Sequence, residues 1–113
     1  NIYIKIMNKK QNYLDILRSI ERKPNLTQRK MASNLGFSLG KLSYCLKSLQ
    51  QKGLVKMGNF SKSKTKIKYI YKLTPHGIAE KTRLTINFMK RKMKEYEELK
   101  SELKKDKNKN INN

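Results

Sequence analysis

The stretch Leu26-Thr-Gln-Arg-Lys-Met-Ala-Ser-Asn-Leu-Gly-Phe-Ser38 predicts two helices joined by a tight turn. Thr27 has the side chain of a good N-cap, and Leu26 before it can act as a hydrophobic staple. Gly36 supplies the left-handed residue that commonly ends a helix. Ser38 can cap the next helix only two residues later. Because so short a connection fixes the second helix across the first, the stretch predicts a helix-turn-helix.

The helix that follows Ser38 is predicted to end at Gly53 and to have one apolar face. The residues predicted to face the core are Leu39, Leu42, Leu46 and Leu49, with Cys45 beside them. We interpret Cys45 as a small buried hydrophobe rather than as a redox sensor. The outward positions near the start of the helix are then Gly40, Lys41, Ser43, Tyr44 and Lys47.

A further helix is predicted upstream, over residues 9–22, because apolar residues recur there at i, i+3, i+4 and i+7. These residues are Tyr13, Ile16, Leu17 and Ile20, and Pro24 ends the helix. Residues 1–8 are predicted to be an N-terminal extension outside the fold, with Met7 as a candidate natural start. The alternative is a short β-type arm.

Beyond Gly53 the apolar period changes from that of a helix to that of a strand. Residues 54–59 are predicted to form one strand and residues 66–73 a second, with a polar basic loop over residues 60–65. Tyr69 and Tyr71 alternate with Lys residues, so we interpret them as core residues rather than as a platform for stacking bases. The segment therefore predicts a β-hairpin with a charged tip.

The last helix is predicted to begin with Thr74 as its cap and Pro75 at its first position, and to run to about Lys105. An apolar stripe with coiled-coil-like spacing follows it, and we predict that this stripe is a dimer interface of antiparallel orientation. The stripe consists of Ile86, Met89, Met93, Tyr96, Leu99 and Leu103. The alternative is a lone helix that folds back on its own domain. Residues 106–113 are predicted to be a disordered tail.

Together these elements predict one fold class, mainly α-helical with a small β-hairpin wing. Residues 9–74 are expected to form a winged helix-turn-helix domain, and residues 75–105 a long C-terminal dimerisation helix. A turn between two helices followed by a basic hairpin is typical of domains that place the second helix in the major groove of DNA.

Charge supports a polyanionic partner. The 113 residues include 28 Lys or Arg against 8 Asp or Glu, which gives a formal net charge of +20. Residues 22–79 hold thirteen of the basic residues and not one acidic residue. A surface made only for solubility normally mixes both signs. Nucleic acid is therefore the leading partner, ahead of an anionic membrane surface.

Composition also excludes several classes of protein. One Cys and one His cannot build a structural zinc site, a disulfide framework or a catalytic dyad of ordinary kind, so we expect no metal, no cofactor and no enzyme. The sequence has no apolar run long enough to span a membrane and does not open with a secretory signal pattern. The expected location is the cytoplasm.

Each outward side chain has a role that duplex DNA would use. Lys41 can reach a guanine or a phosphate, Ser43 a base or a phosphate, and Tyr44 a thymine methyl group or a phosphate. Gly40 would let the backbone approach DNA closely. The complete predicted DNA-binding set is Gln28, Arg29, Ser38, Gly40, Lys41, Ser43, Tyr44, Lys47, Lys62, Lys64 and Lys66, the last three in the wing.

Two strings also carry a family resemblance. The segment 26–38 with Leu49-Gln-Gln-Lys-Gly-Leu-Val55 resembles the core of MarR-type winged helix regulators. Ser38-Leu-Gly-Lys-Leu-Ser-Tyr-Cys-Leu-Lys47 with Lys68-Tyr-Ile-Tyr-Lys-Leu-Thr-Pro-His-Gly77 resembles the short members of that family associated with exopolysaccharide (EPS) biosynthesis loci. The resemblance covers about residues 11–105 and implies a transcriptional regulator that binds duplex DNA as a homodimer. Typical members build an effector pocket from helices at both chain ends, and this chain has a single long helix, so no small-molecule effector is predicted.

Two rival functions remain open from the residues. One is an RNA-binding or architectural winged helix. The other is a protein-interaction module that uses the same domain and the long helix as a scaffold for a partner.

Overall fold

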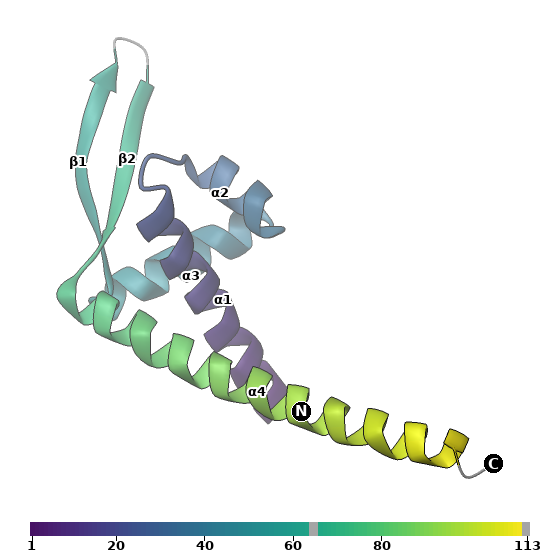
Figure 1. Cartoon of the computed structure of the whole chain (residues 1–113). Coiled ribbons are helices and arrows are strands. Elements are labelled where there is room, and N and C mark those ends of the chain that lie inside the picture. Colours follow the sequence, from purple (N-terminus) through teal and green to yellow (C-terminus); the bar gives the residue numbers. More distant parts are fainter. Residues whose placement is uncertain (64–65, 112–113) are drawn as a thin grey trace.

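Four helices and one hairpin follow each other along the chain (Figure 1). The structure is a computed structural model that describes the backbone of residues 1–63 and 66–111 and the side chains of residues 1–58 and 70–110. The elements are α1 (Ile2–Arg22), α2 (Gln28–Leu35), α3 (Leu39–Gln51), β1 (Val55–Ser63), β2 (Lys66–Leu73) and α4 (Pro75–Ile111). This confirms the predicted class, a mainly helical winged helix-turn-helix with a two-stranded antiparallel wing and a long C-terminal helix.

The turn between α2 and α3 is built as its residues predict. The hydroxyl of Thr27 accepts a hydrogen bond from the backbone N–H of Lys30 at 3.1 Å, and the hydroxyl of Ser38 accepts one from Lys41 at 3.1 Å. Gly36 ends α2 in the left-handed conformation with φ of 70°. Both helices therefore begin on their predicted caps, which confirms the helix-turn-helix.

The core lies where α1, α2 and α3 meet, and the hairpin base and α4 close it. Its buried residues are Tyr13, Leu14, Ile16, Leu17, Ile20, Met31, Ala32, Leu42, Cys45, Leu46, Leu49, Leu54, Val55, Tyr71 and Leu84. The prediction that Leu39 faces this core is wrong, because its side chain is 42% exposed. Leu39 is the first residue of α3, and the buried part of the helix begins one turn later at Leu42.

The first helix is longer than its periodicity indicated. It begins at Ile2, not at residue 9, and the side chain of Asn1 caps it by accepting from the backbone N–H of Tyr3 at 2.9 Å. The segment that we predicted to lie outside the fold as an extension is therefore helical. Met7 also contacts α4, since its Sδ lies 3.6 Å from Nη1 of Arg91. The added turns continue α1 along α4 in the opposite chain direction.

The wing is an antiparallel pair of strands, and within the described part of the chain no third strand joins it. β1 continues to Ser63 rather than ending at residue 59, so the first part of the predicted loop is strand. A register shift between Gly58 and Ser61 interrupts the ladder. At its base Tyr71 lies opposite Met57 and is 3% exposed, which confirms that Tyr71 is a core residue. The side chain of Tyr69 lies outside the described residues.

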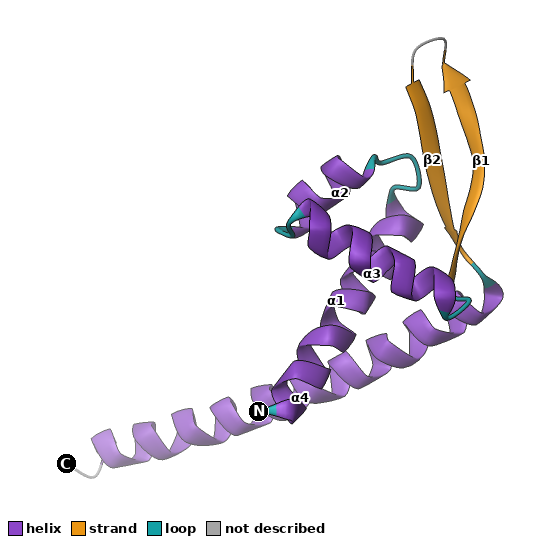
Figure 2. Cartoon of the chain, turned by 180° about the vertical axis from the view of Figure 1, so that it is seen from behind, coloured by secondary structure: helices purple, strands orange, loops and turns teal. Residues whose placement is uncertain are grey.

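The last helix starts against the domain and then leaves it (Figure 2). Leu84 is 5% exposed, and Lys81 Nζ lies 2.6 Å from Glu21 Oε1 in α1. Beyond that contact α4 continues to Ile111, so residues 106–111 are helical and not the disordered segment that we predicted. The segment contains no Gly or Pro, and its lysines lie at the helix end where a positive charge is favoured. The chain consequently measures 73 × 26 × 26 Å.

A close backbone contact joins the end of α3, the wing and α4. The hydroxyl of Thr74 donates to the carbonyl of Gly53 at 2.6 Å and accepts from the N–H of Gly77 at 2.9 Å. Gly77 packs on the backbone of Leu54, and a Cβ at this position would lie 1.9 Å from the Leu54 carbonyl oxygen. Only glycine fits here without moving α4.

We expect Gly77→Ala to lower the free energy of unfolding by about 1–3 kcal/mol, because the added methyl group meets backbone that cannot rotate away. Gly40→Ala is the matched control, since a Cβ at Gly40 has no atom within 4 Å. The control should stabilise the protein by about 0.5–1 kcal/mol through helix propensity. Urea denaturation measures both, and equal stability of the two variants would contradict the assigned contact.

Candidate nucleic-acid interface

The polar face of α3 is open to solvent along its N-terminal half. Gly40, Ser43, Tyr44 and Lys47 lie at i, i+3, i+4 and i+7, so one face of the helix carries them. All four are exposed, and Tyr44 reaches 70% exposure, as the outward positions predicted. Leu42, Leu46 and Leu49 occupy the opposite face in the core.

Three further residues predicted to contact DNA lie near helix starts, Ser38 and Lys41 at the start of α3 and Arg29 at the start of α2. Arg29, Ser38 and Lys41 are exposed. The ammonium group of Lys41 lies 4.1 Å from the centroid of the Phe37 ring, which holds the charge over the turn by a cation–π contact. Lys41 can therefore leave this position for a phosphate or a base edge at small cost, because exposed cation–π contacts are worth only about 0.5–1 kcal/mol.

Among the predicted contacts, Gln28 has a side chain with two hydrogen bonds to other elements of the protein. Its Nε2 donates to the hydroxyl of Tyr71 in β2 at 2.5 Å. Its Oε1 accepts from the hydroxyl of Ser43 in α3 at 2.9 Å. Sequence reasoning assigned Gln28 to a phosphate and missed both partners, which are distant in sequence. The phosphate role of Gln28 stays a prediction.

Two of the three predicted wing lysines lie on the strands of the hairpin. Lys62 lies in β1 and Lys66 in β2, but their side chains are outside the described residues, as is the whole of Lys64. The hairpin stands beside α2 and α3 and extends away from α4 (Figure 1).

The acidic residues that border the basic stretch are engaged elsewhere. Glu21 pairs with Lys81 at 2.6 Å. Glu80 accepts hydrogen bonds from Arg83, and these bonds are the main reason why the pKa of the Glu80 carboxyl lies below its ordinary value. The first pair joins α1 to α4, and the second lies within α4. Among the described residues, the basic side chains of α2 and α3 form no ion pair with a carboxylate.

A basic cavity of about 460 Å³ lies between α1, the end of α3 and the start of α4. The ammonium groups of Lys9 and Lys52 lie 5.7 and 5.0 Å from the centroid of the Tyr13 ring in its wall. Lys10, His76 and Arg83 also line it. Sequence reasoning did not foresee this cavity, because its walls come from three separate segments. Glu80 also lines it and forms an ion pair with Arg83, so the wall holds one acidic side chain among the basic ones.

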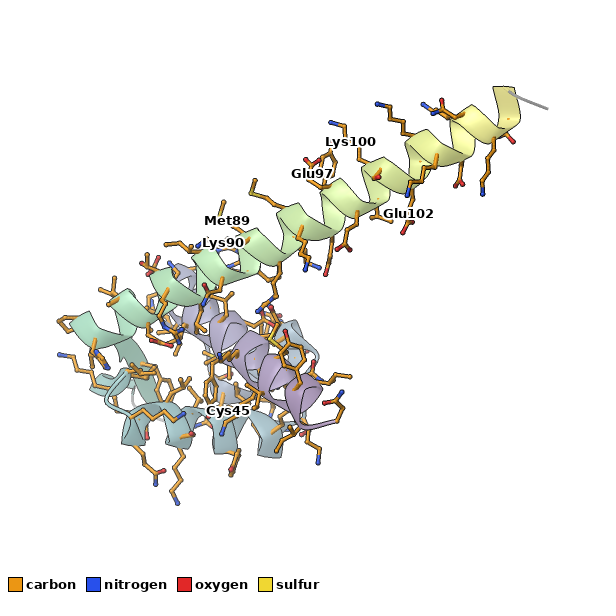
Figure 3. The ribbon with its side chains drawn as sticks, turned by 90° about the horizontal axis from the view of Figure 1, so that it is seen from below. Cys45, Met89, Lys90, Glu97, Lys100 and Glu102 are labelled. Carbon is orange, nitrogen blue, oxygen red and sulfur yellow. The ribbon has the colours of Figure 1, made fainter. Side chains whose placement is uncertain are left out.

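An exposed apolar stripe runs along the outer side of α4. Ile86, Met89, Met93, Tyr96, Leu99 and Leu103 are between 47% and 65% exposed. In Figure 3, Met89, Lys90, Glu97 and Lys100 project from the side of α4 away from the domain, whereas Glu102 projects from the opposite side. Sequence reasoning missed a second exposed apolar group at the start of α1, formed by Ile2, Tyr3, Ile4 and Ile6.

Other kinds of site find no support among the described residues. No three His, Cys, Asp or Glu side chains there gather into a possible metal site. None of the helices is long and apolar enough to cross a membrane. Cys45 is 6% exposed, and burial raises the pKa of its thiol against the opposing effect of Lys41 and Lys9. The thiol of Cys45 is therefore buried in the core, as predicted (Figure 3).

Comparison with known proteins agrees with this geometry. A family model described as winged helix-turn-helix DNA-binding matches residues 12–56, which include α2 and α3. No curated protein sequence matches the chain. The chain resembles the solved structure of SP03579, a MarR family transcription regulator, with a TM-score of 0.66 and 20% identity over 86% of this chain and 67% of that one.

Two further structures share the fold. The PcaV transcriptional regulator from Streptomyces coelicolor, in complex with its natural ligand, has a TM-score of 0.61 and 18% identity over 70% of this chain and 55% of PcaV. A mutant of S. aureus MepR bound to an oligodeoxyribonucleotide has a TM-score of 0.60 and 24% identity over 87% of this chain and 75% of MepR. The chain thus spans little more than half the length of PcaV. At these identities the likeness establishes the fold.

The burial of Cys45 predicts low reactivity. In the native protein at pH 8 its thiol should react with a disulfide reagent at least about a hundredfold more slowly than in urea, because reaction needs both exposure and the thiolate. Absorbance of the released thiolate follows the reaction. Equal rates in the folded and unfolded protein would show that Cys45 is accessible and would reopen a redox role.

Proposed function

We propose that this chain is a MarR-type transcription regulator that binds duplex DNA in a sequence-specific manner. The observation that carries the proposal is the exposed polar face of α3, placed on a capped helix-turn-helix in a stretch without acidic residues. The family model that matches residues 12–56 and the DNA-bound MepR structure support the same function.

In the proposed complex α3 enters the major groove with its N-terminal half. Lys41, Ser43 and Tyr44 then face base edges, and Lys47 lies one turn further along, where a phosphate passes. Arg29 lies at the start of α2, where backbone N–H groups and the helix dipole add to its attraction for phosphate. The wing lies over the neighbouring minor groove with Lys62, Lys64 and Lys66 towards the backbone.

We further propose that the regulator is a homodimer and that the stripe on α4 is its coiled-coil-like interface. Large exposed apolar patches on soluble chains mark interaction surfaces. The exposed apolar residues at the start of α1 form a second apolar group, on the helix that contacts α4 through Met7 and Arg91. The basic segment 90–94 and the acidic residues of segment 95–102 favour an antiparallel crossing, in which opposite charges meet.

A dimer would hold two copies of α3 in a fixed relation. Successive major grooves on one side of a duplex are roughly 34–36 Å apart, so a two-fold protein reads a two-fold site. We place this activity in the cytoplasm and, on the resemblance of segments 38–47 and 68–77, at genes for exopolysaccharide biosynthesis. No small-molecule effector is part of the proposal.

The function can be tested by selection from a random duplex library followed by affinity measurement at fixed salt. We expect the selected duplex to bind at least about a thousandfold more tightly than random duplex, and more tightly than RNA of the same sequence. Equal affinity for all duplexes would favour an architectural role, and preference for RNA an RNA-binding role. Absence of any salt-dependent binding would favour a protein-interaction module.

The wing predicts a salt effect. Changing Lys62, Lys64 and Lys66 together to Ala should flatten the slope of log K against log salt by about 2–3, because each phosphate contact contributes about 0.9. The preference for the selected duplex should stay nearly constant. Changing Lys104, Lys105 and Lys107 to Ala removes equal charge from the far end of α4 and serves as the control. A slope unaltered by the wing substitutions would overturn the role of the wing.

The face of α3 predicts a loss of discrimination. Lys41→Ala and Tyr44→Ala should each reduce the preference for the selected duplex by about 1–3 kcal/mol while changing non-specific binding less. Fluorescence anisotropy with selected and scrambled duplexes measures the two affinities. If both duplexes lose affinity equally, these residues hold phosphates and the bases are read elsewhere.

The α4 stripe predicts the assembly. We expect the intact chain to sediment as a dimer at micromolar concentration and the double variant Met93→Glu, Leu99→Glu to sediment as a monomer, because charges inside the seam must lose their water. Lys105→Glu adds an acid away from the stripe and outside the charged segments 90–94 and 95–102, so it should leave the dimer intact. A monomeric intact chain would refute the interface.

A further inference from the structure

The carboxamide of Gln28 links three elements of the DNA-facing domain. Gln28 is the first residue of α2. Its hydrogen bond to Tyr71 reaches the wing, at 2.5 Å, and its hydrogen bond from Ser43 reaches the outward face of α3, at 2.9 Å. One side chain therefore connects the start of the helix-turn-helix, the recognition face and the hairpin.

The link matters because the wing has little else to hold its direction. The hairpin is a two-stranded sheet that pairs with no third strand among the described residues, and a hairpin alone is marginally stable. Its attachment to the domain is at its base, through buried residues such as Val55 and Tyr71. A small rotation at the base would displace the distant tip by a much larger amount.

Because Tyr71 is buried, substituting it can distinguish an effect inside the protein from a direct contact with DNA. The residue is 3% exposed, so a molecule as large as a duplex cannot touch it. Its partner Gln28 is half-buried, and Ser43 is exposed. Any effect of Tyr71 on DNA binding must consequently pass through the protein, and Gln28 is the side chain that its hydroxyl contacts.

We propose that Gln28 is a positioning residue that sets the direction of the wing relative to α3, and that this internal link is its main contribution to DNA binding. The proposal rests on the proposed DNA-binding function. It replaces the phosphate contact expected for Gln28 with an indirect role. It also assigns a function to the Tyr71 hydroxyl, which has no part in reading DNA directly.

A double-mutant cycle tests the link on the duplex selected from the random library. Gln28→Met keeps the length of the side chain and removes both hydrogen bonds, and Tyr71→Phe removes one. We expect each to weaken binding by about three- to tenfold, and the double variant to bind within about twofold of Gln28→Met alone. The proposal is overturned if the fold-losses in affinity of the two single variants multiply in the double variant. It is also overturned if Tyr71→Phe binds the duplex as tightly as the unchanged protein.

Tyr13→Phe is the matched control. Its hydroxyl lies 2.7 Å from the Ser48 hydroxyl, the residue is 7% exposed, and the pair joins α1 to α3 without involving the wing. The control loses a buried tyrosine hydroxyl of the same kind, so it should leave the affinity for the selected duplex within about twofold. An equal loss in the control would show that the effect of Tyr71→Phe is one of general stability.

A trimmed duplex separates positioning from a general structural role. The selected duplex is shortened until changing the wing lysines to Ala no longer alters its affinity, so that only α2 and α3 still contact it. On this duplex Gln28→Met and Tyr71→Phe should bind like the unchanged protein, because the direction of the wing no longer matters. A loss as large as on the full duplex would overturn the proposal and favour a direct contact by Gln28.

Hydrogen exchange of the free protein tests the same link without DNA. Gln28→Met and Tyr71→Phe should speed exchange of the backbone amides of residues 55–58 and 70–73 by at least about threefold, and Tyr13→Phe should not. Unchanged exchange in the first two variants would overturn the link even if DNA binding is found. Faster exchange in a protein that binds no nucleic acid would keep the link and reject the DNA-binding function.

Discussion

Burial of the inner face of α3 is the constraint on which the rest of the structure depends. Leu42, Leu46 and Leu49 are at most 2% exposed, and fully burying each is worth about 1.5–3 kcal/mol. Rotating the helix to present another face would expose all three, at about 5–9 kcal/mol, which approaches the whole stability of a small domain. The cap at Ser38 and the left-handed Gly53 fix where the helix begins and ends. Burial of these leucines therefore determines which residues of α3 face the solvent.

The hairpin and α4 are attached to the same end of α3. Thr74 donates a hydrogen bond to Gly53, and Gly77 packs on Leu54. The chain therefore returns to the end of α3 after forming the wing. This junction gives the wing and the long helix a common base. Farther along, α4 packs on α1 near Leu84 and then continues beyond the domain.

The starts and ends of the helices were predictable from the sequence, because the residues that form each cap are close to one another in the chain. The caps at Thr27, Ser38 and Thr74 and the stop at Gly36 each involve residues within a few positions. The apolar face of α3 was predictable for the same reason, apart from Leu39. The burial of a residue at a helix end depends on what lies beside it in space, which periodicity does not contain.

The remaining differences have the same physical origin. Residues 1–8 were predicted to be an extension because Met7 is a candidate start. In the structure Ile2, Tyr3, Ile4 and Ile6 are exposed, so no buried face marks this part of α1. Residues 106–111 looked disordered by composition, yet their residues are compatible with continuing a helix already formed. The partners of Gln28 were out of reach because Tyr71 lies 43 residues away and Ser43 lies 15 residues away. The cavity beside Tyr13 likewise needs three segments together.

The most direct test of the account is the change in backbone amide NMR signals of the intact chain when it binds its selected duplex. The account predicts the largest changes in α3 from Leu39 to Lys47, at the start of α2 and along the hairpin, with small changes over residues 12–20 of α1. Changes concentrated in α1 or along α4, with α3 unaffected, would contradict it.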